Sequence, residues 1–205
     1  IRELGLKLEE SPVHRYVQQL YRELDRKGVK KFRPQCYLTD EWGCPSGEPV
    51  IGIPFYLAHT DLARLERELN DLETTREIMM YIRHEAGHAF NYAYKLYNTP
   101  EWKQLFGPFR RPYRDNYRPI PFSRNYVRHL AGWYAQKHPD EDFAETFAVW
   151  LTPGSRSFTV TGADDGFLDQ VRRIFVDSHA GLRRNQQRDT ARLPELEGRG
   201  GILVD

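Results

Sequence analysis

The spacing of apolar residues in the first third of the chain predicts two helices and two short strands. Residues 11–28 repeat apolar side chains at helical intervals and end at Gly28, and residues 61–69 predict a second, heavily charged helix. Between them, residues 36–38 and 50–53 are β-prone runs joined by a turn-rich connection. We therefore expect two strands between these two helices.

Two stronger helical patterns follow. Residues 75–96 form the longest, and it stops ahead of Pro100 because a residue before proline disfavours the helical conformation. Residues 141–151 predict an amphipathic helix after Pro139, and a short helix is expected at 125–136. The packed face of the long helix carries Ile78, Ile82, Ala86 and Ala89.

These elements predict an α+β fold that is rich in helix, with a small, mostly antiparallel sheet packed on the helices. The aromatic share of 13% indicates a core built from rings as well as aliphatic side chains. The Pro-rich stretch 106–126 is expected to be irregular, and the polar tail after residue 185 to be poorly ordered.

Charge and hydropathy narrow the classes of function. A net charge of +1 argues against a nucleic-acid-binding or membrane-surface protein, which usually carries a large basic excess. No stretch approaches the ~20 apolar residues of a membrane span, and the charged opening segment 1–7 is not a secretory signal. We therefore expect a cytoplasmic location, while a removed signal or pro-segment stays open because the chain lacks an initiator Met.

Two cysteines, Cys36 and Cys44, are expected to be free thiols in a reducing compartment. A small disulfide loop is the alternative. Their separation matches no usual zinc spacing.

The long helix contains the sequence His84-Glu85-Ala86-Gly87-His88, an H-E-x-x-H pattern. Residues i and i+4 share one face of a helix, so both imidazoles can reach one ion, and neutral imidazole suits Zn²⁺. Glu85 lies beside the first ligand, where it can take a proton from zinc-bound water. We therefore predict a zinc site with His84 and His88 as ligands and Glu85 as general base.

A catalytic zinc usually has three protein ligands, and the third must come from another part of the chain. Asn91 and Tyr94 occupy the positions where an extended motif would place Gly and His. Glu141 and Glu145 share a face of the later helix, so we expect Glu141 to bind zinc and Glu145 to accept the free ring N–H of a zinc-bound histidine. Exchanged roles and a solvated acidic face remain alternatives. Weaker candidates are Asp142, His138 and His129.

Tyr134 lies seven residues before Glu141, close enough to reach the same ion and to donate a hydrogen bond to a developing oxyanion. The chain has twelve tyrosines, so this assignment has competitors. They are Tyr113, Tyr117 and Tyr126.

This arrangement resembles the gluzincin-type metallopeptidases, in which a Glu-x-x-x-Glu helix follows H-E-x-x-H, and is similar to the catalytic domains of anthrax lethal factor and the Pro-Pro endopeptidases. The resemblance implies that Glu141 binds zinc, that Glu145 supports it from outside and that Tyr134 assists catalysis. Over a longer span the chain resembles a zinc-binding metallopeptidase family of bacteria. The resembling segments are 37–42, 53–58, 83–88 and 138–148.

The resemblance implies a single zincin-like domain over residues 1–205, with its metal core at about 37–154. The expected reaction is attack by zinc-bound water on the carbonyl of a peptide or protein substrate, with neither nucleic acid nor membrane as a partner. Residues 51–56 are a candidate edge strand for pairing with an extended substrate. The alternatives are a zinc hydrolase of a non-peptide amide or ester, and a non-catalytic zinc-stabilised binding module.

Residues 110–128 contain six arginines interleaved with prolines and tyrosines. The first interpretation is a rigid surface crossing whose arginines pair with carboxylates. The second is a wall of the active-site cleft that selects acidic groups on the substrate. Binding of nucleic acid by arginine and aromatic stacking is a third, without other support in the chain.

Overall fold

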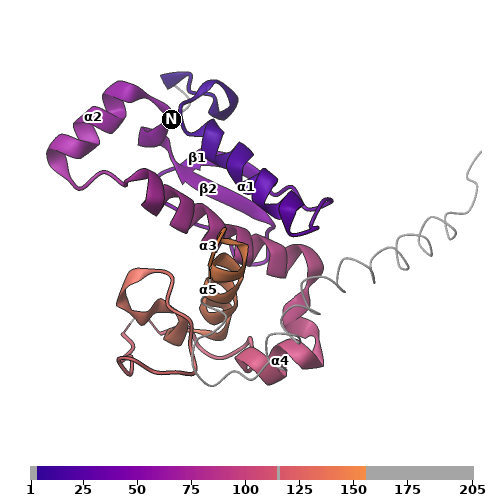
Figure 1. Ribbon diagram of the computed structural model, residues 1–205. Helices are drawn as coiled ribbons and strands as arrows, with labels where there is room; N and C mark the ends of the chain where they lie inside the picture. The colour runs from indigo at the N-terminus through magenta and orange to yellow at the C-terminus, as the bar shows by residue number, and fades with distance from the viewer. Residues whose placement is uncertain (1–3, 115, 156–205) are drawn as a thin grey trace, which may run out of the picture.

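The computed structural model describes residues 4–114 and 116–155. Within these ranges the chain forms five α-helices, a two-stranded sheet and several short 3-10 helices (Figure 1). The longer elements are α1 (His14–Arg26), β1 (Gln35–Thr39), β2 (Val50–Pro54), α2 (Thr60–Leu69), α3 (Thr75–Tyr94), α4 (Pro100–Phe106) and α5 (Pro139–Leu151). The 3-10 helices are η2 (Leu8–Glu10), η3 (Phe55–Ala58), η4 (Leu96–Asn98) and η5 (Ala131–Gln136).

Helix α3 runs through the middle of the molecule, with α1 and the sheet on one side and α5 on the other (Figure 1). Its start is a capping box: the Thr74 hydroxyl accepts from the Glu77 amide, and the Glu77 carboxylate accepts from the Thr74 amide. Its end is Lys95, which adopts a left-handed φ of 51°. The long helix predicted over 75–96 is therefore confirmed.

The sheet is parallel, with Gln35 opposite Val50 and Thr39 opposite Pro54. The α+β class is confirmed, but the prediction of a mostly antiparallel sheet is wrong. The connection between the two strands is too long for a tight hairpin. After leaving β1, the chain first runs antiparallel beside β2 and only then turns to enter β2 itself. That return makes one antiparallel bridge, in which Gly43 exchanges backbone hydrogen bonds of 2.7 and 3.4 Å with Gly52.

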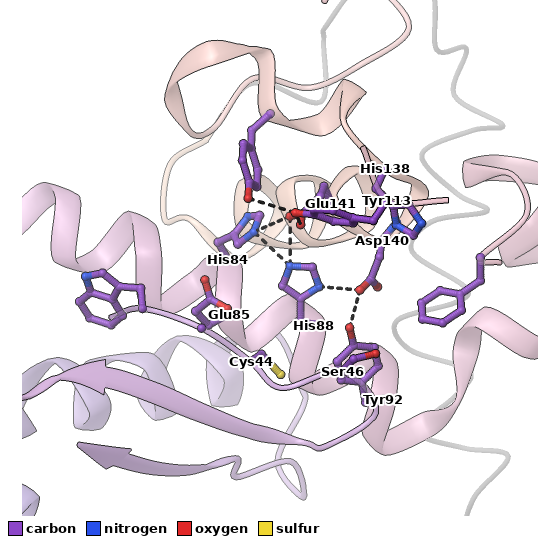
Figure 2. Close-up of a pocket in the computed structure, with 14 residues that line it drawn as sticks. Cys44, Ser46, His84, Glu85, His88, Tyr92, Tyr113, His138, Asp140 and Glu141 are labelled. Atoms are coloured by element: carbon purple, nitrogen blue, oxygen red, sulfur yellow. Dashed lines mark hydrogen bonds and ion pairs between the residues drawn. The ribbon is translucent and has the colours of Figure 1, made fainter. Parts of the chain in front are cut away.

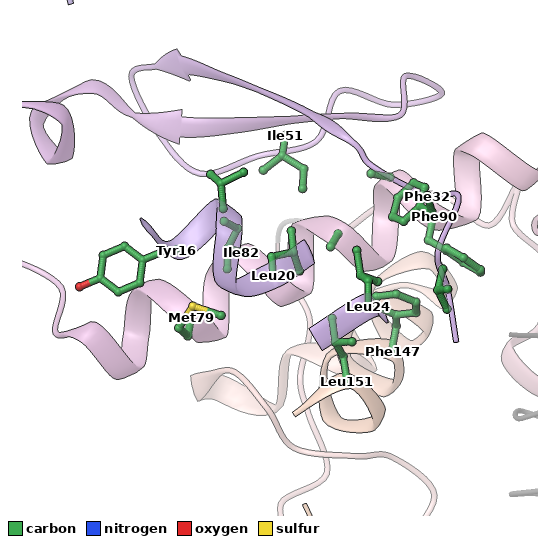
Figure 3. Close-up of a cluster of buried hydrophobic side chains, with 14 of the residues drawn as sticks. Tyr16, Leu20, Leu24, Phe32, Ile51, Met79, Ile82, Phe90, Phe147 and Leu151 are labelled. Atoms are coloured by element: carbon green, nitrogen blue, oxygen red, sulfur yellow. The ribbon is translucent and has the colours of Figure 1, made fainter. Parts of the chain in front are cut away.

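The hydrophobic core fills the space between α1, β2, α3 and α5 (Figure 3). Leu20 of α1 and Ile82 of α3 are fully buried. The rings of Phe90 and Phe147 join α3 to α5 with centroids 5.1 Å apart, as the aromatic composition suggested. The core therefore fixes α3 between the sheet and α5, and this position orients the residues described below.

Three helix predictions need correction. Helix α4 was not predicted, because seven residues are too few to show a period. The helix expected at 125–136 is confined to η5, since Gly132 and Trp133 adopt left-handed φ values of 77° and 60°. Helix α5 is not amphipathic: all its residues are buried, because α3, α4 and η5 surround it.

Both cysteines are free thiols, as expected, so the alternative of a disulfide loop is wrong. No helix in the described ranges combines the length and apolarity needed to cross a bilayer. The tail predicted after residue 185 lies outside the described residues. The single domain over 1–205 stays a prediction.

Candidate metal centre

Helices α3 and α5 bring three side chains to one point (Figure 2). His84 and His88 lie one turn apart on α3, and Glu141 lies in the first turn of α5. The Nε2 atoms of the two histidines are 3.1 Å apart, and Oε2 of Glu141 lies 3.0 and 3.2 Å from them. All three residues are buried, and in the described part of the chain they form the group suited to holding a metal ion.

The other ring nitrogens show which atoms carry protons. Nδ1 of His84 faces Glu145 at 3.1 Å, and Nδ1 of His88 faces Asp140 at 3.0 Å. An ionised carboxylate only accepts hydrogen bonds, so each Nδ1 donates and each neutral ring keeps a lone pair on Nε2. Two such lone pairs and a carboxylate oxygen therefore converge. A tetrahedral Zn²⁺ with bonds of about 2.0–2.1 Å separates its ligands by roughly 3.3 Å, so the group fits zinc.

Asp140 is a functional residue that the sequence analysis missed. Besides facing His88, it accepts hydrogen bonds from the Asn91 amide at 2.7 Å and from the Tyr92 hydroxyl. Asn91 and Tyr92 lie three and four residues after His88, on the same face of α3. This spacing, together with the carboxylate of Asp140 next to Glu141, is the sequence feature from which this network could have been predicted. The network fixes the orientation of the His88 ring.

Glu145 occupies the matching position behind His84. Its carboxylate also accepts from the backbone amides of His129 and Leu130, at 2.8 and 3.0 Å, and its side chain is fully buried. Glu145 therefore faces Nδ1 of His84 and the loop before η5. Glu141 faces the two Nε2 atoms instead.

Next to the three converging atoms is a cleft of about 490 Å³. Its lining includes the carboxylates of Glu85, Asp140 and Glu141, and it includes no lysine or arginine among the described residues. The Glu85 carboxylate has no hydrogen-bond partner in the described ranges, and burial raises its pKa. Glu85 thus presents to the cleft a carboxylate that no described residue engages in a hydrogen bond.

Two tyrosines reach the cleft. The Tyr134 ring lies 5.7 Å from the His84 ring, and its hydroxyl is 3.3 Å from that of Tyr113. The Tyr113 hydroxyl donates to Oε1 of Glu141 at 2.6 Å, which leaves Oε2 of Glu141 for the histidines. Tyr117 instead donates to the carbonyl of Gly132. Tyr134 therefore lies in the cleft beside His84, with Tyr113 next to it.

Comparison with known proteins agrees with this geometry. Residues 49–180 match the profile of a family described as "Putative zinc-binding metallo-peptidase". The chain belongs to this family. The match contains the His84 and His88 motif and Glu141, and it continues past the described residues. No curated protein and no solved structure matches.

The weaker ligand candidates have other roles in this member of the zinc-binding metallopeptidase family. His138 caps α5 by accepting from the Asp140 amide, and its Nε2 lies 2.8 Å from the Arg111 carbonyl. His129 Nε2 lies 3.0 Å from the Met80 carbonyl. Asp142 is buried away from the ligand atoms, and desolvation, with Glu145 nearby, raises its pKa well above the usual value.

The metal-free protein should show a distinctive dependence of stability on pH. Burial lowers the pKa of His84, but its hydrogen bonds to Glu141 and Glu145 outweigh this and raise the pKa from 6.5 to about 9. Burial raises the pKa of Glu141, but its hydrogen bonds to both histidines outweigh this and hold the pKa far below 4.5. The His84 contribution is complete below pH 6.5 and is lost as pH rises through 9, and the Glu141 contribution is complete above pH 4.5.

We therefore expect the Tm of the chelator-treated chain to be highest between pH 4.5 and 6.5 and to fall toward pH 9. Zinc should remove this fall, since the metal replaces the protons between the ligands. Calorimetry of the metal-free and zinc-loaded chains over this range measures both. Equal pH profiles for the two forms would contradict the prediction.

Proposed function

We propose that this chain is a zinc-dependent peptidase in which His84, His88 and Glu141 bind the metal. The observation that carries the proposal is the convergence of two histidine ring nitrogens and a carboxylate oxygen beside the Glu85 carboxylate, which no residue of the described ranges hydrogen-bonds. A structural zinc has no need of a buried base in an open cleft, so this pairing favours a catalytic site over a zinc-stabilised binding module.

Zinc bound there supplies a Lewis acid that activates water and polarises a carbonyl group. Glu85 takes the proton of the attacking water and passes it to the leaving amine. The Tyr134 hydroxyl donates to the oxyanion that forms on the carbonyl oxygen.

Glu145 and Asp140 support this chemistry from behind the two histidine rings. Each accepts the Nδ1 proton of one histidine, which keeps the Nε2 lone pair directed at the metal. Tyr113 holds the second oxygen of Glu141, so that one oxygen remains for the metal. The arrangement with Glu141 and Glu145 exchanged is disfavoured, because the amides of His129 and Leu130 already occupy Glu145.

An extended peptide is the substrate that the cleft favours. The expectation that residues 51–56 offer a free strand edge is wrong at Gly52, because Gly43 covers that edge. The neighbours of a paired residue in an antiparallel ladder point their backbone groups to the opposite side. Trp42 and Cys44 therefore direct their backbone N–H and C=O groups away from β2. Within the described ranges these groups make no backbone hydrogen bonds. Both residues line the cleft. Such an edge can pair with a substrate backbone.

The direct test loads the purified chain with one equivalent of zinc and measures cleavage of an unstructured peptide library by mass spectrometry. We expect cleavage that a chelator abolishes and added zinc restores. A panel of non-peptide esters and amides is assayed in parallel. Turnover of that panel without peptide cleavage would favour a different hydrolase, and zinc binding without any turnover would favour the binding module.

A further inference from the structure

The surface of residues 110–128, named here the arginine segment, carries six cations that no carboxylate of the described residues neutralises. All six side chains are exposed, and within residues 4–114 and 116–155 none forms an ion pair. Within these ranges the structure therefore does not support the interpretation in which the arginines pair with carboxylates. The six are Arg110, Arg111, Arg114, Arg118, Arg124 and Arg128.

The charge of the chain is unevenly distributed as a result. The arginine segment contains six basic residues and one acidic residue, Asp115. The rest of the chain contains 24 basic and 28 acidic residues, so it is net negative. A nearly neutral protein with one strongly positive surface attracts anionic partners to that surface. The net charge of the whole chain, +1, does not show this uneven distribution.

Apolar side chains project from the same surface. Ile120 is 68% and Phe122 81% exposed. The loop that carries them is held in place, because the Gln136 side chain bonds both the amide and the carbonyl of Ile120, at 2.8 and 2.9 Å. Tyr117 adds a hydrogen bond to the Gly132 carbonyl. A fixed loop presents these apolar groups at little further cost in conformational entropy on binding.

The arginines of this segment border the cleft without lining it. Phe109 and Tyr113 line the cleft, and arginines precede or follow both of them in the chain. At the other end of the segment, Arg128 stacks on the Trp133 ring at 4.6 Å, and Trp133 directly precedes Tyr134. None of the six arginines lines the cleft, so they cannot select a charge next to the reacting bond. They can contact a polypeptide only where it leaves the cleft.

We propose that the arginine segment binds an acidic stretch of the protein substrate, with apolar side chains of that stretch against Ile120 and Phe122. This rests on the proposed function, since it assumes that a polypeptide occupies the cleft. A peptide fits the surface better than a lipid bilayer, because the cations continue the wall of the cleft. The substrate class is thus a protein with an acidic, partly apolar segment near the cleaved bond.

Binding of a fluorescein-labelled peptide with four Glu-Glu-Leu repeats tests this by anisotropy on the full chain. The test variant combines Arg114→Gln, Arg118→Gln and Arg124→Gln, whose side chains make no contact that the fold needs among the described residues. The control combines Arg22→Gln, Lys30→Gln and Lys31→Gln, which removes the same charge from exposed positions on α1 and in the segment that follows it. We expect the test variant to bind about tenfold more weakly and the control less than twofold.

Equal losses in the two variants, or no loss in either, would overturn the proposal. So would tighter, arginine-dependent binding to phosphatidylserine vesicles than to the peptide, which would identify a membrane surface instead. Peptide binding needs no hydrolysis and should survive Glu85→Gln. A failure of peptide binding is therefore distinguishable from a failure of the peptidase assignment. In the active enzyme, the test variant should raise KM for acidic peptides about tenfold and leave cleavage of neutral peptides unchanged.

Discussion

We expect Glu85→Gln to leave one zinc ion bound and to lower the rate of peptide cleavage by about 10³-fold or more. General base catalysis typically contributes 10² to 10⁴ to a rate, and in the proposed mechanism the same carboxylate serves both proton transfers. Glutamine has nearly the same shape and cannot accept the proton. Because Glu85 lies outside the group of His84, His88 and Glu141, the metal ligands are unchanged.

Zinc content by atomic spectroscopy and single-turnover cleavage of a peptide found in the library screen measure the two effects separately. Glu101→Gln is the matched control, since this glutamate is exposed on α4. Full activity of Glu85→Gln with zinc in place would remove Glu85 from the mechanism. Loss of zinc in this variant would show instead that Glu85 helps to hold the metal.

Gly87→Ala should lower both the stability of the fold and its affinity for zinc. A Cβ atom at Gly87 would lie 2.8 Å from Cα and 3.0 Å from the carbonyl oxygen of Ala144, and 3.2 Å from Cβ of Phe147. These are backbone atoms or atoms next to the backbone of α5, and they cannot move without the helix. The added methyl group therefore forces α3 and α5 apart.

Because Glu141 lies on α5 and both histidines lie on α3, this separation also opens the metal site. We expect a loss of about 1–3 kcal/mol in the free energy of unfolding, as for an overpacked core. Zinc affinity should fall about 10- to 100-fold, as when the support of metal ligands is removed. Chemical denaturation and competition with a chromophoric chelator measure the two quantities.

Gly43→Ala is the matched control, because a Cβ atom there would meet no atom within 4 Å. It should leave the free energy of unfolding and the zinc affinity nearly unchanged. A Gly87→Ala protein as stable as the wild type and with unchanged zinc affinity would show that the two helices are free to separate at this point.

The sequence predicted those parts of the site that depend on local geometry. The spacing of His84 and His88 puts them on one face of any helix that contains both, whatever surrounds it. The same holds for Glu141 and Glu145 on α5. The helices themselves were predictable because each shows several turns of apolar periodicity, whereas α4 is too short to show one.

The tertiary structure decided what depends on contacts between distant segments. The spacing of Glu141 and Glu145 left their roles interchangeable, and the approach of α5 to α3 places one against the Nε2 atoms and the other against Nδ1. Asp140 and Tyr113 join the site for the same reason. The parallel sheet and the Gly43 bridge follow from the path of a long connection, which the local pattern leaves undefined.

The H-E-x-x-H motif shows most clearly which features the sequence determined and which the tertiary structure decided. The positions of its histidines and of Glu85 follow from the helical period, so the sequence alone determined a candidate zinc site with a carboxylate beside it. Gly87 within the same motif is unfavourable for an isolated helix, and nothing in the sequence explains it. The structure does: the backbone of Ala144 occupies the space of its missing side chain, and this close approach brings Glu141 to the two histidines.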